Sequence, residues 1–323
     1  MAESAHDLIA RFVGLPVLLV GDLMLDEFIW GSVSRISPEA PVPVLEVQRR
    51  TVAVGGAANT AANVVALGGA AVLAGVVGAD SAGERMRELL TAQGVGVGPV
   101  VADPARPTTT KTRVVAGTQQ VVRIDHELPG PLTDAVADAL LTAVGRVLPT
   151  VRGVVVSDYG KGVVTPEVAA RVIQAAVAAG VPVVVDPKGT NYTKYRGATL
   201  VKPNQLEAGQ VLNRSLRTDA DVDRAGADLV QLLGGWTGVL ITRGPHGMTA
   251  FEPGRPPVHV PARAREVYDV TGAGDTVAAT LTLALAAGAS LEAACHLASQ
   301  AAAVVVGKAG TAVCTAAELR AAG

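Results

Sequence analysis

The segment Asp269-Val270-Thr271-Gly272-Ala273-Gly274-Asp275 joins a glycine-rich turn to an alanine-rich stretch that we expect to be helical from about Thr276 to Ala286. Glycines permit a sharp turn and leave backbone N–H groups accessible, and a helix N-terminus adds the positive end of its dipole. The Gly272–Gly274 amides therefore predict an anion hole for a transferring phosphoryl group. Asp275 beside them would accept the proton of an attacking hydroxyl. The alternative is an ordinary helix start, in which Asp275 only complements the dipole.

Other polar residues lie where predicted strands or helices begin and end. Gly55 and Gly56 precede a predicted helix, where paired glycines let a ligand approach the backbone, and Asn59 offers both a donor and an acceptor. A simple helix start explains this segment about as well. Asp22 and Asp26 follow the first predicted strand, and such a carboxylate pair can bind a ligand or cap a turn.

A third polar cluster follows two later strands, as Asp186-Pro187-Lys188-Gly189 and Lys202-Pro203-Asn204-Gln205-Leu206-Glu207. An amide beside a carboxylate, as in Asn204 and Glu207, suits a hydrated Mg²⁺ that takes few protein ligands. A helix capping box formed by the same two residues is the open alternative. The segment Ser157–Gly162 fails as a Walker A loop, and no dinucleotide fingerprint follows a strand.

The elements that must position these residues alternate between strand and helix. Continuous apolar runs predict buried strands at Pro16–Val20, Ala71–Val77, Gly153–Ser157, Pro182–Asp186, Thr199–Lys202 and Gly238–Thr242. Helices are predicted at Ala57–Leu67, Ala82–Gln93, Thr133–Val147, Pro166–Ala179, Asn204–Leu212 and Asp219–Leu233. This order predicts an α/β fold with a mostly parallel sheet covered on both faces, and a ligand beyond the carboxyl ends of its strands.

Two regions interrupt the alternation. The segments 27–50 and 106–126, approximately, resemble exposed hairpins, with Pro38, Pro41 and Pro43 in the first and Gly117 at a turn of the second. We expect them to form a small β-sheet lid inserted into one domain that spans 1–323. Two surface loops without a role are the alternative.

Composition excludes several classes of protein. The 323 residues carry a formal net charge of −2, which gives no overall attraction to nucleic acid or anionic membranes. The two cysteines and five histidines match no metal-ligand spacing, and we expect both cysteines to be buried and reduced. The N-terminus has no signal-peptide pattern, and no apolar run reaches the roughly 20 residues of a spanning helix. We therefore expect a cytoplasmic protein.

The segment 269–275 resembles the closing signature D-T-x-G-A-G-D of the PfkB or ribokinase-like carbohydrate kinases. The resemblance implies a three-layer sandwich with a small β-sheet lid, ATP and Mg²⁺ as cofactors, and sometimes a monovalent cation such as K⁺. It implies that Asp275 is the catalytic base, next to an anion hole of Gly272, Ala273 and Gly274. The remaining roles implied are sugar contacts at Asp26, Gly55, Gly56 and Asn59, nucleotide contacts at Lys188, Asn204, Thr242, Gly244, Asp269 and Gly307, and metal contacts, mostly through water, at Asn204 and Glu207.

Within this family the chain is similar to the D-glycero-D-manno-heptose 7-phosphate kinases of nucleotide-activated heptose synthesis. The similarity lies in Ser34–Val44, Gly55–Asn59, Gln119–Asp125, Ser157–Gly162 and Asp186–Gly189. It implies ATP-dependent phosphorylation of the anomeric hydroxyl to the 1,7-bisphosphate, and a homodimer paired through the lid. Lys111, Arg113 and Arg123 would bind the substrate's own phosphate, unless they only protect an exposed strand. We also expect Asp158 to contact the substrate.

Relatives of that branch continue into a nucleotidyltransferase half, whereas this chain stops at Gly323. We therefore expect either that a separate enzyme performs adenylyl transfer or that the product serves another route. A ribose, fructose phosphate or nucleoside kinase is the alternative within the family. A sugar- or nucleotide-binding regulator on the same fold would be expected to have lost the base, yet Asp275 is present. A dehydrogenase would need the dinucleotide fingerprint, which the sequence lacks.

Overall fold

A computed structural model describes residues 5–263 and 267–322. Its larger sheet has nine strands in the order β13-β12-β11-β10-β9-β8-β1-β4-β5. Neighbouring strands are parallel from β11 to β5, and β12 and β13 are antiparallel additions at one edge. The strands are β1 (Pro16–Gly21), β4 (Ala70–Gly78), β5 (Val100–Asp103), β8 (Gly153–Ser157), β9 (Val183–Asp186), β10 (Leu200–Val201), β11 (Gly238–Thr242), β12 (Met248–Phe251) and β13 (Val258–Val260).

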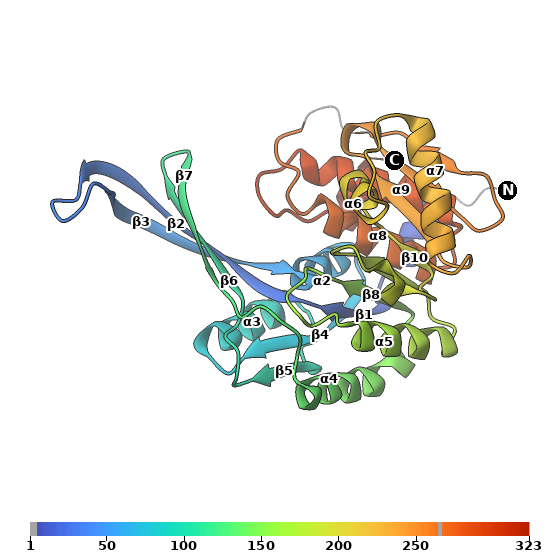
Figure 1. The fold of residues 1–323 in the computed structure, drawn as a ribbon, viewed down its shortest axis with the longest axis horizontal. Helices are drawn as coiled ribbons and strands as arrows, with labels where there is room; N and C mark the ends of the chain where they lie inside the picture. The colour runs from blue at the N-terminus through green and yellow to red at the C-terminus, as the bar shows by residue number, and fades with distance from the viewer. Residues whose placement is uncertain (1–4, 264–266, 323) are drawn as a thin grey trace.

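Helices cover both faces of this sheet, as Figure 1 shows. One apolar cluster joins the sheet to α1 (Ala5–Ala10), α2 (Ala57–Ala66), α3 (Ser81–Ala92), α8 (Ala273–Ala286), α9 (Leu291–Val306) and α10 (Ala316–Ala321). A second joins it to α4 (Asp134–Val147), α5 (Pro166–Ala178), α6 (Gln205–Val211) and α7 (Asp219–Leu232). Neighbours in one strand alternate between the clusters, with Val155 in the first and Val154 and Val156 in the second. The predicted three-layer sandwich is confirmed.

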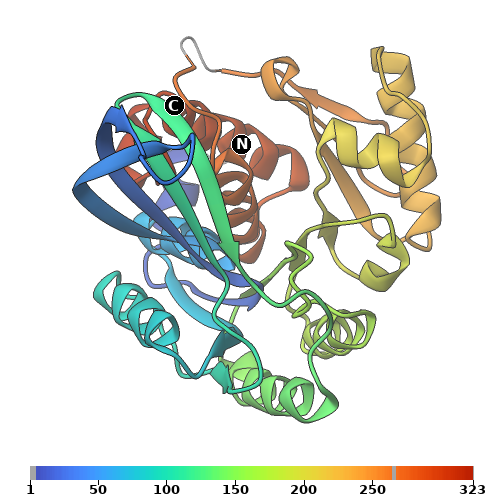
Figure 2. The ribbon, with the colours of Figure 1, turned by 60° about the vertical axis from the view of Figure 1, so that its left-hand side comes forward.

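A second sheet of four strands, in the order β3-β2-β6-β7, extends from the body of the molecule (Figures 1 and 2). It consists of β2 (Leu23–Ile36), β3 (Pro43–Gly56), β6 (Thr110–Ala116) and β7 (Gln119–His126), and we call it the small sheet. The pairs β2–β3 and β6–β7 are antiparallel, whereas β2 and β6 are parallel. The first hairpin starts before residue 27 and continues beyond residue 50. Its use as a lid stays a prediction.

The register of the small sheet separates its two faces. Lys111 lies opposite both Asp26 and Asp125, and Arg113 lies opposite Arg123. Directly opposed residues point to the same side, so Asp26 and the three predicted phosphate-binding cations share one face. The register places Ile29, Val114, Val122 and Ile124 on the opposite face.

The helix that contains the predicted base begins earlier than the sequence indicated. It starts at Ala273 rather than near Thr276, with Gly272 as N-cap in the left-handed region at φ 81°. Only glycine adopts this conformation without steric cost. The early start turns the Gly-Ala-Gly segment into the helix N-terminus itself and places Asp275 in the first turn.

Candidate active site

Asp275 is buried where α8, α2 and the segment after β8 meet. One carboxylate oxygen, Oδ1, accepts hydrogen bonds from the hydroxyls of Thr60 and Tyr159, each at 2.8 Å. The other, Oδ2, accepts one from the Asn59 amide at 2.7 Å. Burial raises the pKa of Asp275, while these hydrogen bonds and the charge of Lys202 oppose the rise. A buried carboxylate with a raised pKa can take a proton from a hydroxyl near neutral pH.

Unpaired backbone amides lie next to this carboxylate. Within residues 5–263 and 267–322, the N–H groups of Gly272, Gly274 and Asp275 have no acceptor, whereas Ala273 donates to the Val270 carbonyl at 3.2 Å. The helix dipole adds positive potential at the same place. This N-terminus can therefore stabilise an anion, with Ala273 contributing less than the sequence predicted.

The buried Lys202 and the partly buried Asp186 form an ion pair of 3.0 Å beside this helix start. A side chain on Gly274 would approach the Lys202 ammonium to 3.5 Å and the Asp186 carboxylate to 3.8 Å. Burial raises the pKa of Asp186 to about 6, although Lys202 opposes the rise. Sequence analysis assigned no role to either residue. In the sequence, each is a charged residue at the end of a predicted strand. The parallel pairing of β9 and β10 makes the two residues neighbours.

The predicted sugar-binding residues converge on the junction of the two sheets. Asp26 is buried at the base of β2 and pairs with Arg113 at 2.5 Å. A Cβ on Gly55 would overlap the Asp26 carboxylate, so glycine is required there for this carboxylate to keep its position. Gly56, at φ 63°, ends β3 and caps α2, which brings Asn59 to Asp275.

Asn204 and Glu207 form the capping box that the sequence left open. The Asn204 side chain accepts from the Glu207 N–H at 2.9 Å, and Glu207 accepts from the Asn204 N–H at 3.0 Å. The second Glu207 oxygen faces the Lys188 ammonium at 3.1 Å. In the described ranges, no three His, Cys, Asp or Glu side chains lie together as a metal site. The metal role of the pair stays a prediction.

The other predicted nucleotide contacts lie in two loops. Thr242 ends β11 and bridges to Asn204, and Gly244 follows in a short 3₁₀ turn. Asp269 accepts hydrogen bonds from the backbone and hydroxyl of Thr271 and from the Gly310 N–H. It thereby ties the segment before α8 to the segment after α9, where Gly307 is the C-cap.

Asp158 is buried between its own loop after β8 and the 3₁₀ turn Tyr192–Tyr195. One of its oxygens accepts from the Gly160 N–H, and the other from the Lys194 ammonium and the Tyr195 hydroxyl. These contacts give the carboxylate a role in fixing the loop, and the predicted substrate contact has no support from them. Lys111 and Arg123 both pair with Asp125, at 3.9 and 2.8 Å, on the same face of the small sheet as Asp26.

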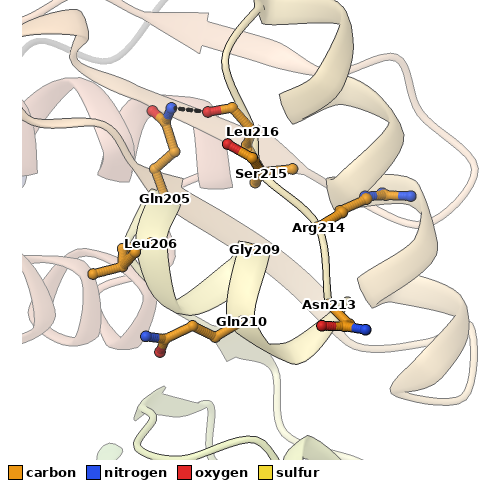
Figure 3. A pocket seen from close by; sticks show the side chains of 8 residues that line it. All are labelled: Gln205, Leu206, Gly209, Gln210, Asn213, Arg214, Ser215 and Leu216. Atoms are coloured by element: carbon orange, nitrogen blue, oxygen red, sulfur yellow. Dashed lines mark hydrogen bonds between the residues drawn. The ribbon is translucent and has the colours of Figure 1, made fainter.

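A surface cavity of about 670 Å³ lies beside α6 (Figure 3). Its lining includes Leu206, Gln210 and Asn213, and the Gln205 amide donates across it to the Leu216 carbonyl. No predicted site residue lines it. No helix within the described ranges has the length and hydropathy needed to cross a membrane.

Known proteins with similar sequences all point to one family. The family model described as pfkB family carbohydrate kinase matches residues 17–318. The bifunctional protein HldE of Caulobacter vibrioides is 50% identical over 321 residues, 99% of this chain and 66% of that protein. The HldE of Desulfatibacillum aliphaticivorans is 44% identical over 320 residues, 99% of this chain and 65% of that protein. The chain thus spans somewhat less than two thirds of these relatives.

Solved structures share the fold. Phosphofructokinase-2 from Escherichia coli in complex with potassium has a TM-score of 0.79 at 24% identity, covering 96% of this chain and 97% of that one. Arabidopsis thaliana ribokinase complexed with ribose and ATP has a TM-score of 0.75 at 20% identity, covering 96% and 99%. With the family model matching nearly the whole sequence, this chain belongs to the pfkB family of carbohydrate kinases, which are phosphotransferases.

Proposed function

We propose that this protein is an ATP-dependent kinase of D-glycero-D-manno-heptose 7-phosphate that phosphorylates the anomeric hydroxyl and forms the 1,7-bisphosphate. The observation that carries the kinase chemistry is the buried Asp275 carboxylate beside the unpaired amides of the α8 N-terminus. The heptose assignment is supported by the resemblance in the segments quoted above and by the HldE relatives. We expect the reaction in the cytoplasm, where ATP is available.

In this mechanism the sugar binds at the junction of the two sheets, against Asp26 and Asn59. Asp275 accepts the proton as the O–H bond of the anomeric hydroxyl breaks and its oxygen forms a bond to the γ-phosphorus of ATP. The bond from that phosphorus to the bridging oxygen breaks, and its electrons leave with ADP. The Gly274 and Asp275 amides and the Lys202 ammonium stabilise the negative charge on the transferring group.

Two cations belong to the proposal. The chemistry around Asp186 and Glu207 fits Mg²⁺, because Asp186 is a partly buried carboxylate with a raised pKa, and a further positive charge would stabilise its ionised form. When bound with ATP, Mg²⁺ would neutralise phosphate charge while keeping most of its water ligands. A monovalent cation such as K⁺ is supported only by the potassium complex of the E. coli relative.

The substrate's phosphate is assigned to the small sheet. Lys111, Arg113 and Arg123 share a face with Asp26, so a sugar bound at Asp26 can extend toward them. Each cation already has a carboxylate partner, Asp26 or Asp125, and a phosphate would compete for or bridge these pairs. A guanidinium has enough donors for both a carboxylate and a phosphate.

The direct test measures ADP formation with a panel of acceptors: heptose 7-phosphate, free heptose, fructose 6-phosphate, ribose and a nucleoside. The expected result is a kcat/KM with heptose 7-phosphate at least about tenfold above every other acceptor. A preference for another acceptor would overturn the heptose assignment and leave the family membership intact.

The phosphate assignment has its own test in Arg123→Ala. Losing a charge-assisted hydrogen bond to the substrate's phosphate should lower kcat/KM with heptose 7-phosphate about ten- to hundredfold. Free heptose should be affected little, because it lacks the group that the guanidinium would bind. An equal loss with both acceptors would contradict a phosphate contact. Arg255→Ala, which removes an exposed arginine beside Glu252, is the control and should change neither value.

A further inference from the structure

The two oxygens of the Asp275 carboxylate are bonded unequally. A carboxylate accepts about four hydrogen bonds, two at each oxygen. Thr60 and Tyr159 fill both positions of Oδ1, whereas Asn59 fills one position of Oδ2. Oδ2 is therefore the oxygen with a lone pair left for the hydroxyl of a substrate.

We propose that Tyr159 is a positioning residue for phosphoryl transfer, which holds Oδ1 so that Oδ2 of Asp275 faces the substrate as the proton acceptor. This inference rests on the proposed kinase function and assigns a role to a residue that the sequence analysis named only within the segment Ser157–Gly162. Tyr159 does not touch the reacting atoms. Its hydroxyl fixes the rotation of the carboxylate and thereby selects the basic oxygen.

Asp22 holds the segment that contains Tyr159 through hydrogen bonds to its backbone. This buried carboxylate accepts hydrogen bonds from the backbone N–H groups of Tyr159 and Lys161 at one oxygen and of Val163 at the other. Asp22 lies between β1 and β2. Three backbone hydrogen bonds to one carboxylate restrict the conformation of this loop, so the backbone of Tyr159 has a fixed position from which its ring extends.

A second tie joins the same loop to the base of the small sheet, where Lys161 pairs with Glu127 at 2.7 Å, one residue beyond the end of β7. The loop is thus bonded at two places: near Asp22, where the chain first enters the small sheet, and near Glu127, where it finally leaves it. This arrangement keeps the tyrosine hydroxyl directed at Asp275 while the sheet contacts a substrate.

The charges around Asp275 determine what removal of the hydroxyl would do. Asp186 at the end of β9 and Lys202 after β10 act on the site with opposite signs, and Asp26 contributes from β2. The phenol of Tyr159 has a pKa raised well above 10 by burial and by neighbouring carboxylates, so it remains a donor at every working pH. Its hydrogen bond favours the ionised form of Asp275, and without it the pKa of Asp275 would rise further.

The test compares Tyr159→Phe with the parent in two measurements on the full chain. One is the pH dependence of kcat, taken with whichever acceptor of the panel gives the highest turnover. The other is the titration of the Asp275 carboxyl by carbon-13 NMR, with Asp275→Asn used to assign the signal, which requires no sugar. Tyr192→Phe is the control, since the Tyr192 hydroxyl is buried and has no hydrogen-bond partner among the residues that the structure describes.

We expect Tyr159→Phe to lower kcat about tenfold at neutral pH and to move the acidic midpoint and the carboxyl titration upward by about half a unit or more. The loss of kcat should be larger at acidic than at alkaline pH, and Tyr192→Phe should match the parent. An equal loss at every pH with an unmoved carboxyl titration, or no loss at all, would overturn the positioning role.

Two further results distinguish a failure of the Tyr159 role from a failure of the substrate assignment or of folding. If heptose 7-phosphate is not accepted but another sugar is, the substrate assignment fails and the comparison proceeds with that sugar. If Tyr159→Phe does not fold, Thr60→Val removes the other donor to Oδ1 and must move the carboxyl titration in the same direction. An unmoved titration in Thr60→Val would then overturn the inference that Oδ1 is the anchored oxygen.

Discussion

At the scale of single residues, the chemistry of Asp275 depends on burial more than on its immediate neighbours. Three neutral donors and one ammonium favour its ionised form, yet removal from water raises its pKa overall. The site can tolerate this cost because the same dry surroundings strengthen the interaction of Lys202 and the helix amides with a transferring phosphoryl group.

Replacing Asp275 by Asn should therefore separate catalysis from binding. Asn keeps the shape but cannot accept the proton, so kcat should fall about 10²–10⁴-fold. ATP affinity measured by calorimetry should remain within a few-fold of the parent, because the amides of α8 are unchanged. A kcat within tenfold of the parent would eliminate Asp275 as the base.

The two cysteines are predicted to be inert in the folded chain. Cys295 and Cys314 are fully buried, and burial raises the pKa of each thiol to about 12. Since the thiolate is the reactive form, a disulfide reagent at pH 8 should modify neither thiol until the chain unfolds. In denaturant both should react. Rapid modification of the native protein would show that α9 or the segment before α10 opens readily.

The sequence was informative where a residue's role follows from its neighbours in the chain. Asp275 and Gly272 were singled out as site candidates because a turn, a helix start and a carboxylate are consecutive. Lys202, Asp186 and Tyr159 were not assigned, because their proximity arises from the pairing of separate strands and from a loop anchored at Asp22. Spacing along the chain contains no direct information about such contacts.

At the scale of elements, the six predicted strands and seven predicted helices are all present, with ends displaced by a few residues. The chain adds β5, β12 and β13, which are too short to give a periodic signal, and α9, whose apolar positions are not restricted to one face. The start of α8 was misplaced because a glycine-rich segment has low helix propensity, and the left-handed Gly272 cap overrides it.

Two helical glycines give opposite predictions from the same substitution. A Cβ on Gly226 of α7 would overlap the ring of the buried Phe251, so Gly226→Ala should destabilise the fold by about 1–3 kcal/mol. Gly145 of α4 is exposed, with no neighbouring atom within 4 Å of an added Cβ. Gly145→Ala should stabilise the fold by about 0.5–1 kcal/mol. Urea unfolding measures both, and equal effects would contradict the packing of α7 on β12.

At the scale of the whole molecule, the small sheet exposes apolar surface that the body does not cover. Ile124 and Val122 on β7 are 55% and 47% exposed, and Val47 on β3 is 50% exposed. A single chain rarely leaves so many large apolar residues on one exposed element. We expect the face with Ile29, Val114, Val122 and Ile124 to be covered by the small sheet of a second copy, because the opposite face is directed to the proposed substrate.

The oligomeric state tests this arrangement. Light scattering of the parent at micromolar concentration should give about twice the chain mass of 32.6 kDa. The double variant Val122→Glu and Ile124→Glu should be monomeric, since two buried carboxylates on each partner would cost more than the apolar contact contributes. Val177→Glu on α5, where the valine is 51% exposed, is the control and should remain dimeric.

A monomeric parent, or a double variant that stays dimeric, would exclude this face as the interface. A monomeric variant that also loses kcat/KM for the sugar would indicate that pairing holds the small sheet against the substrate.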